Sequence, residues 1–169
     1  KYQRGRLLLI AGSERYRGAA HLAVRGALAS GAGSVEACLP ESVAEHLWQQ
    51  APEVVLRSAL ASDRQGALAW GEALEESDLA RLDAVLLGPG LGMVPGCWRQ
   101  WAEPLLGFTG LLVLDADGLN QLAAADGGWR WLLKRSGPTW LTPHGGEFQR
   151  LFPDCQHDSP LDQAAAAAD

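Results

Sequence analysis

Short apolar runs recur along the 169 residues, and each is followed by a glycine-rich or polar loop and then by a helical pattern. Such runs are typical of strands covered on both faces, as parallel strands are. Strands that alternate with helices form βαβ units with right-handed crossovers. The expected strands cover residues 6–10, 34–39, 54–56, 84–87, 111–114 and 138–141. The expected helices cover residues 18–30, 98–106, 119–125, 148–152 and 161–168, with one more after residue 42. The sequence therefore predicts a single α/β domain over residues 1–169 with a mostly parallel central sheet.

Two further signals mark helix starts. Ser42 and Glu45 form an S-x-x-E capping box, and Ser159 precedes Pro160 as an N-cap precedes a first-turn proline. The last helix has barely two turns before Asp169. Because a doubly wound sheet normally continues with another strand, we expect the domain to be incomplete at its C-terminus. A genuine terminal helix or an alanine tail is the alternative.

Charge and cysteine content exclude several classes of function. The formal net charge of −6 argues against electrostatic binding of nucleic acid or of an anionic membrane. No apolar run reaches the ~20 residues that span a bilayer, and no signal peptide is visible. Cys38, Cys97 and Cys155 are odd in number and form no CxxC pair, so we expect neither a disulfide framework nor a zinc site. These features favour a cytoplasmic protein with no metal held by its own residues.

Glycines cluster where two of the expected strands end. Ala11-Gly12-Ser13 follows the first strand, and Gly18 opens the helix after it. Gly88-Pro89-Gly90-Leu91-Gly92 follows the fourth strand, although a plain turn needs only one glycine. Such loops can bring backbone N–H groups against a phosphate or a flat ring, and close helix–sheet packing is the alternative explanation. The spacing is not G-x-G-x-x-G, so a dinucleotide fingerprint is absent.

Polar side chains follow the fifth and sixth expected strands. Asp115-Ala116-Asp117-Gly118-Leu119-Asn120 places carboxylates where they can accept from a ligand hydroxyl or hold hydrated Mg²⁺, while Asp117 with Gly118 also suits a turn and a helix cap. Thr142-Pro143-His144-Gly145-Gly146-Glu147 places an imidazole before a glycine-opened helix. Because ligands of open α/β sheets bind outside the carboxyl ends of the strands, the four loops predict one shared pocket.

Taken in order, these motifs resemble one family. They are AGS, GAAHLA, GAGSV, Ala51-Pro52-Glu53, GPGLG, LDADGLN and LTPHGGEFQRL, and they extend from about Arg4 to about Leu151. The set resembles the ADP/ATP-dependent NAD(P)H-hydrate dehydratases, the carbohydrate-kinase-like domain of YjeF-type proteins. The resemblance implies a three-layer fold of the ribokinase-like superfamily.

The resemblance also implies an activity and a set of site residues. Such enzymes phosphorylate the hydroxyl of hydrated NADH or NADPH with ADP or ATP, assisted by Mg²⁺, and then eliminate phosphate. By motif position, Ala19, Gly92 and His144 correspond to substrate contacts, with Asp117 and Asn120 as further candidates. Gly12, Gly18, Gly88, Gly90 and Gly145 correspond to the loops around the phosphates and the ring. Relatives of this kind commonly form homotetramers and can be fused to an N-terminal NAD(P)H-hydrate epimerase domain.

This sequence departs from the family pattern at its end. The family continues with a Lys-Gly motif and a Gly-Thr-Gly-Asp helix start, which carry the adenine nucleotide site and the catalytic aspartate, and neither motif occurs here. The general base is therefore unassigned. A small-molecule kinase of the same superfamily, acting on a sugar or a vitamin precursor, and a non-catalytic nucleotide-binding module remain alternatives.

We expect the 169-residue chain alone not to restore NADH from its hydrate when ATP and Mg²⁺ are present, because positioning loops do not replace a missing general base. The measurement is the absorbance of the reduced nicotinamide ring over time, with a complete enzyme of the family as positive control. Recovery of NADH by the chain alone would contradict this expectation.

Overall fold

The computed structural model describes residues 4–62, 64, 66, 68, 74–94, 96–155 and 159–168. Its centre is a six-stranded sheet in which every paired neighbour is parallel, in the order β3-β2-β1-β4-β5-β6. The strands are β1 (Arg6–Ile10), β2 (Ser34–Pro40), β3 (Val55–Leu60), β4 (Ala84–Leu87), β5 (Leu111–Leu114) and β6 (Thr139–Leu141). The predicted α/β class and parallel sheet are confirmed.

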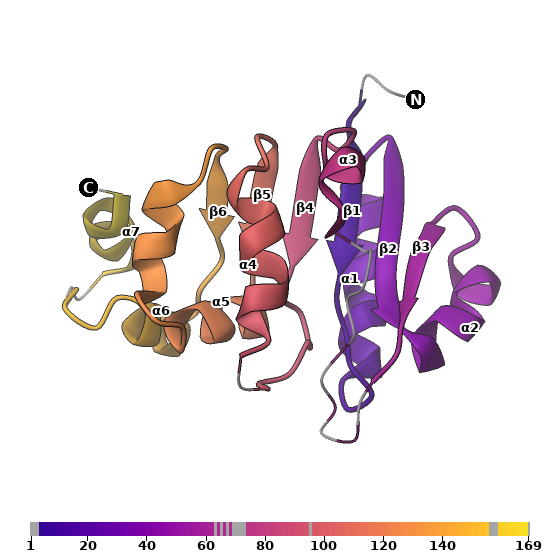
Figure 1. Ribbon diagram of the computed structural model, residues 1–169, viewed down its shortest axis with the longest axis horizontal. Coiled ribbons are helices and arrows are strands. Elements are labelled where there is room, and N and C mark those ends of the chain that lie inside the picture. The colour runs from indigo at the N-terminus through magenta and orange to yellow at the C-terminus, as the bar shows by residue number, and fades with distance from the viewer. Residues whose placement is uncertain are drawn as a thin grey trace.

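Helices cover both faces of this sheet, with α4 in front of it and α1 behind it in Figure 1. The α-helices are α1 (Arg17–Ala29), α2 (Glu41–Gln50), α3 (Glu76–Leu79), α4 (Trp98–Leu106), α5 (Ala116–Ala123), α6 (Gly145–Leu151) and α7 (Pro160–Ala168). A 3-10 helix, η3 (Gly128–Lys134), lies between α5 and β6. In the described part of the chain, no helix has the length and apolar character needed to cross a membrane.

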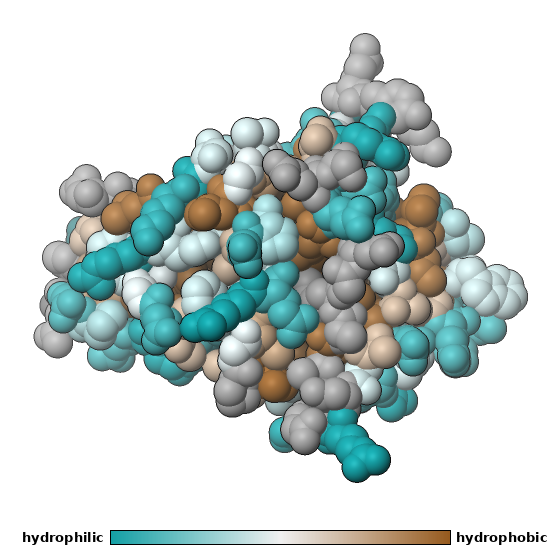
Figure 2. All heavy atoms as spheres, in the orientation of Figure 1, coloured by the Kyte–Doolittle hydropathy of each residue, from teal (hydrophilic) through white to brown (hydrophobic). Residues whose placement is uncertain are grey.

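Alternating side chains of the strands build two cores, as the period of two in a strand requires. On one face Leu8 and Ile10 of β1 pack in a cluster with Trp101 of α4. On the other face Leu9 of β1 packs in a cluster with Val24 of α1. The central strands are therefore buried on both sides, which explains why they consist of apolar runs. At the surface viewed in Figure 2, hydrophobic residues lie between hydrophilic ones.

The predicted capping box at Ser42 and Glu45 is wrong. Helix α2 begins at Glu41, Pro40 precedes it, and no side chain caps its first turn. Pro40 is also the last residue of β2 and pairs with Leu60, so the helix starts directly after the strand. Ser42 consequently lies inside the first turn, and its buried Oγ has no hydrogen-bond partner among the described residues.

Strand β3 is longer than the three residues predicted for it. It extends to Leu60 and carries Arg57 and Ser58, which interrupt the apolar pattern used for the prediction. As the edge strand it keeps one neighbour, β2, and the ion pair from Arg57 Nε to Glu36 Oε2 (3.0 Å) supports that pairing. Burial raises the pKa of the Cys38 thiol on β2 to about 12, so this thiol stays protonated, as expected of a buried cysteine.

Arg135 joins three elements at the amino end of β5 and β6. Its guanidinium donates to the carbonyl oxygens of Leu105, Gly110 (3.2 Å) and Pro138 (3.3 Å), and its Nε donates to Thr139 Oγ1 (3.0 Å). Burial lowers the pKa of Arg135. The end of α4, the start of β5 and the start of β6 are therefore held by one side chain.

Replacing Arg135 by Met keeps an apolar stem but leaves these acceptors without their donor. We expect the Arg135→Met chain to lose about 2–4 kcal/mol of unfolding free energy, because part-buried acceptors of a charged donor are left unpaired. Urea denaturation followed by circular dichroism measures this loss. The exposed Arg130, which lies over the Trp129 ring, provides the control, and its replacement by Met should change stability by less than about 0.5 kcal/mol. Equal effects of the two substitutions would refute the role given to Arg135.

Candidate functional site

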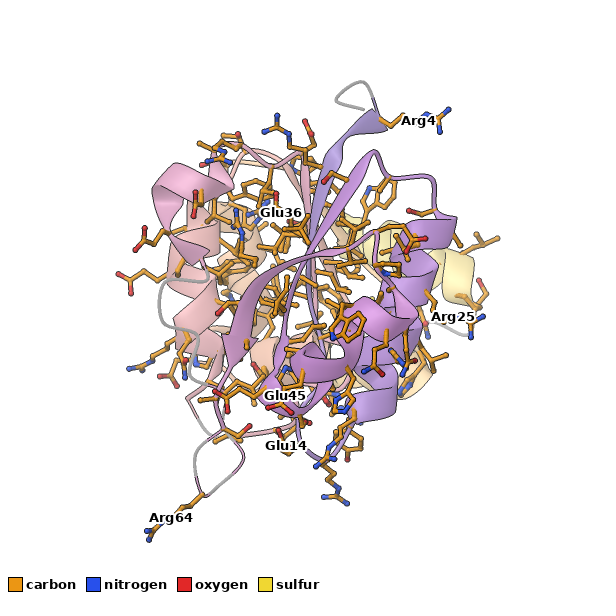
Figure 3. The ribbon with its side chains drawn as sticks, turned by 90° about the vertical axis from the view of Figure 1, so that its right-hand side faces the viewer. Arg4, Glu14, Arg25, Glu36, Glu45 and Arg64 are labelled. Carbon is orange, nitrogen blue, oxygen red and sulfur yellow. The ribbon has the colours of Figure 1, made fainter. Side chains whose placement is uncertain are left out.

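The sheet reverses its winding between β1 and β4. These strands pair directly, but β1 leads into α1, which packs on one face, and β4 leads into α4, which packs on the other. In open α/β sheets a crevice forms where the loops diverge in this way, at the carboxyl ends of the strands. Figure 3 shows that Arg4, before β1, and Glu14, after it, lie at opposite ends of the sheet, so Glu14 marks the crevice end.

The loops after β1 and β4 contact each other directly. Gly12 N donates to Pro89 O (2.7 Å), and Gly12 adopts φ +84°. Gly90 adopts φ +69°, and a Cβ added there would lie 2.6 Å from Ala19 Cβ. A Cβ added to Gly12 would lie equally close to Ala20 Cβ. Two of the predicted loop glycines and Ala19 are thus brought together, and their small size is required by protein packing.

The remaining glycines of the GPGLG loop differ in what surrounds them. A Cβ on Gly88 would lie 1.8 Å from Asp115 O, so this glycine lets the loop approach the turn after β5. Gly92 also has a positive φ (+86°), but a Cβ there would meet no heavy atom within 4 Å. Of Gly88, Gly90 and Gly92, only Gly92 faces open space. Gly18 and Gly145 have similarly open surroundings at the starts of α1 and α6.

Helix α5 fixes the backbone of Gly92 from both sides. Gly92 N donates to Asp117 Oδ2 (2.8 Å), and Gly92 O accepts from Gln121 Nε2 (2.7 Å). Gln121 Oε1 in turn accepts from the indole Nε1 of Trp101 (2.9 Å). Trp101 is fully buried and Gln121 is 5% exposed. Sequence reasoning did not identify Gln121 or Trp101, because nothing in the spacing of α4 and α5 indicates that the two helices meet behind the loop.

The cap of α5 differs from the sequence prediction. Helix α5 begins at Ala116, three residues before the predicted start, and Asp115 Oδ1 accepts from Ala116 N (2.8 Å). Asp115 is therefore the N-cap, while Asp117 lies in the first turn and binds Gly92. Ala116 adopts φ +47°, which allows the chain to turn into the helix directly from β5.

His144 and Asn120 lie farther along the same end of the sheet. His144 is the N-cap of α6: its Nδ1 accepts from Gly146 N (3.1 Å), and its backbone N donates to Glu147 Oε2 (3.0 Å). With Nδ1 accepting, Nε2 is the ring nitrogen that can donate, and it lies 3.3 Å from Glu147 Oε1. Asn120 Oδ1 accepts from Arg150 Nε (2.9 Å), which joins α5 to α6.

A cavity of about 330 Å³ lies at the crevice between the loops after β1 and β4. Its described lining comprises Ser13, Glu14, Arg15, Tyr16, Gly66, Leu91, Gly92, Met93, Val94 and Asp117. Met93 also borders a cavity of about 480 Å³ with Asn120 and Arg150. The two cavities share Met93 in their linings; Gly92 and Asp117 line the first, and Asn120 lines the second. His144 is not among the described residues that line either cavity.

A larger cavity lies elsewhere among the described residues. It measures about 670 Å³ and is bordered by α3, α4 and residues 107–109, which precede β5 at the opposite end of the strands. Volume alone favours this cavity, but it contains none of the loop motifs. We place the candidate site at the smaller cavity because the winding of the sheet, the open Gly92 and the carboxylate of Asp117 coincide there.

The chain is similar to known proteins over nearly its whole length. The sequence model of the family described as NAD(P)H-hydrate dehydratase matches residues 7–169. A bifunctional NAD(P)H-hydrate repair enzyme of Synechocystis sp. is 46% identical over 168 residues, which make up 99% of this chain and 30% of that protein. The chain thus spans less than a third of the length of this curated relative.

Two solved structures share the fold. A ribokinase-like superfamily protein of Enterococcus faecalis superposes with a TM-score of 0.70 at 21% identity, over 96% of this chain and 55% of that one. The ADP/ATP-dependent NAD(P)H-hydrate dehydratase of Bacillus subtilis, co-crystallised with ATP and Mg²⁺, has a TM-score of 0.63 at 28% identity, over 89% of this chain and 48% of that one. The predicted ribokinase-like architecture is confirmed.

The link between Gln121, Trp101 and Gly92 can be tested through stability. Replacing Gln121 by Ala leaves the Trp101 indole N–H and the Gly92 carbonyl without their partner. We expect a loss of about 2–4 kcal/mol in unfolding free energy, because each unpaired buried group costs about 1–3 kcal/mol. Gln149 on α6 is exposed and serves as the matched control, with an expected change below about 0.5 kcal/mol. Urea denaturation of both variants gives the comparison, and similar losses would contradict the proposed link.

Proposed function

Since the chain belongs to the NAD(P)H-hydrate dehydratase family, we propose that its crevice binds hydrated NADH or NADPH for ADP- or ATP-dependent dehydration. The observation that carries this proposal is the open Gly92 beside Asp117, at the point where the sheet reverses its winding. A backbone without a side chain lets a flat ring lie close to it, and ligands of such sheets bind at this point.

The five residues that correspond to substrate contacts each have a part in the proposed binding. The backbone of Gly92, held by Asp117, forms the surface against which the nicotinamide ring lies. Ala19 packs against Gly90, and its small side chain leaves room beside the loop. His144 presents an imidazole that is 68% exposed and fixed by the cap of α6, and Asn120 lines the adjoining cavity. We propose that these residues bind and orient the hydrate.

The reaction proposed is a two-step removal of water. The ring hydroxyl would give its proton to the general base, which is unassigned here, as its oxygen bonds to the terminal phosphorus of ATP or ADP and the bond to the departing nucleotide breaks. Phosphate then leaves with its bonding electrons while a ring proton is removed, which restores the dihydropyridine. Binding and orientation by the loops contribute proximity to these steps.

Magnesium fits this chain only together with the nucleotide phosphates. Among the described residues no three histidine, cysteine or acidic side chains gather into a metal site. One oxygen each of Asp115 and Asp117 already accepts a backbone N–H, so their second oxygens are the candidate ligands. Mg²⁺ is commonly held by one or two carboxylates plus substrate phosphates, and it would neutralise charge on the transferred phosphoryl group.

The proposed function includes a compartment, an oligomeric state and a partner domain. We propose a cytoplasmic protein that assembles as a homotetramer and that works beside an NAD(P)H-hydrate epimerase domain. The bifunctional name of the Synechocystis relative and the 30% of its length that matches support the second domain. Exposed apolar side chains such as Leu22 (71%) and Trp48 (69%) support association between copies of the chain. Sedimentation equilibrium measures the oligomeric state.

Binding of the hydrate can be measured without turnover. We expect NADPH hydrate at a hundredfold excess over its Kd to stabilise the chain by ~2.7 kcal/mol, because a ligand of the folded state shifts the unfolding equilibrium. Thermal unfolding with and without ligand gives this value. A sugar or a vitamin-precursor alcohol should give no shift. Stabilisation by such an alcohol and not by the hydrate would favour a small-molecule kinase.

A substitution of His144 separates its helix cap from its contact with the ligand. Asn is also a good N-cap, so His144→Asn should keep α6 and the stability of the free chain. The loss of the imidazole should weaken hydrate binding about tenfold, equivalent to one hydrogen bond. The exposed His46 on α2 is the control, and His46→Asn should bind as the unaltered chain does. Unchanged binding by the folded His144→Asn chain would remove His144 from the site.

A further inference from the structure

Ser13 combines deep burial with an unpaired hydroxyl group. It is 5% exposed, and its Oγ has no hydrogen-bond partner among the described residues. Buried polar side-chain atoms in folded proteins are in large majority hydrogen-bonded, so an unpaired hydroxyl requires an explanation. Ser13 also lines the 330 Å³ cavity, together with Gly92 and Asp117. The residue that carries the unpaired group therefore forms part of the wall of the candidate site, with its Oγ buried beneath the cavity surface.

The backbone around Ser13 is fixed on both sides. Gly12 N donates to Pro89 O (2.7 Å), which holds the preceding residue against the GPGLG loop. The carbonyl oxygen of Ser13 accepts from Tyr16 N (3.0 Å), which holds the start of the turn into α1. The position of Ser13 in the cavity wall is thus set before any ligand binds, and such preorganisation lowers the cost of binding.

The charged groups around this cavity are mixed in sign, and a neutral polar group fits among them without a counterion. The carboxylate of Asp117 lies in the same lining, and a second carboxylate, Glu14, forms an ion pair with Arg17 (2.8 Å). Arg15 lies over the ring of Tyr16, 5.4 Å from its centroid. A phosphate beside Asp117 would need Mg²⁺ to offset the repulsion between the two negative charges, whereas a hydroxyl group needs no counterion, because it can both donate to and accept from its neighbours.

Resting on the proposed function, we propose that Ser13 Oγ hydrogen-bonds the hydroxyl group of the hydrated nicotinamide ring and so determines the preference for the hydrate over intact NAD(P)H. The two molecules differ by one added water, which places the hydroxyl on the ring. Intact NAD(P)H offers no group at that position and leaves Ser13 buried and unpaired. A site built to pair with a substrate hydroxyl rejects the analogue that lacks it, for this reason.

The test compares two ligands and two serine substitutions in the full chain. Isothermal titration calorimetry measures Kd for NADPH hydrate and for NADPH. Ser13→Ala should weaken binding of the hydrate about tenfold, the worth of one hydrogen bond, and leave NADPH binding unchanged. Ser42 on α2 is the matched control, because its Oγ is also buried and unpaired but lies outside the cavity lining. Ser42→Ala should alter neither Kd.

The outcomes separate this assignment from the proposed function. Hydrate binding unchanged in a folded Ser13→Ala chain, or equal weakening for both ligands, would overturn the role of Ser13 and leave the proposed function standing. Absence of hydrate binding by the unaltered chain would overturn both. Ser13→Ala removes an unpaired atom and should keep the melting temperature. If that chain does not unfold cooperatively, Ser13→Cys provides the second comparison. A thiol is a weaker donor than a hydroxyl group, so the Kd for the hydrate should still rise. A Kd for the hydrate equal to that of the unaltered chain would then contradict the assignment.

Discussion

The parallel pairing of β1 with β4 is the constraint on which the rest of the structure depends. It joins Leu7 to Ala84 and Ile10 to Leu87, and it places two loops side by side whose helices depart to opposite faces. Because each helix needs its own apolar face of the sheet, both strands must be buried on two sides. The crevice between their loops is a geometric consequence of this winding.

The elements best predicted from the sequence are those whose boundaries are set locally. The fourth and fifth strands and the helix between them have the predicted limits, because apolar residues end there at glycine, proline or a polar turn. Two of the errors occur where a strand end sets the boundary of the following helix. Pro40 extends β2 because it pairs with Leu60, so the helix starts before the capping box. Asp115 caps α5 because the end of β5 brings it there.

The candidate site was predictable in its loops but not in its hydrogen bonds. Glycines and an aspartate after parallel strands indicated the end of the sheet at which the candidate cavity lies, and Gly92 with Asp117 was among the residues named. Single-sequence patterns could not separate a glycine required by packing, such as Gly88, from one that faces open space. They also could not show that Gln121 and Trp101 support the loop from behind, because that contact depends on how two helices pack.

Packing and recognition consequently involve different atoms of the same short loops. Gly12, Gly88 and Gly90 admit neighbouring protein atoms at distances that exclude a Cβ, so their contribution is to the fold. Gly92 and Ser13 gain nothing comparable from the protein: a Cβ on the first would meet open space, and the buried oxygen of the second has no partner among the residues that the structure describes. A fold selected for stability alone would pair or remove that oxygen, since an unpaired buried hydroxyl is unfavourable. Among the described residues, Ser42 has a similar unpaired oxygen away from the candidate cavity, so burial alone does not indicate a ligand site. At Ser13 the unpaired oxygen coincides with a cavity wall held by Pro89 and Tyr16, and this combination supports a surface shaped for a polar group of a ligand.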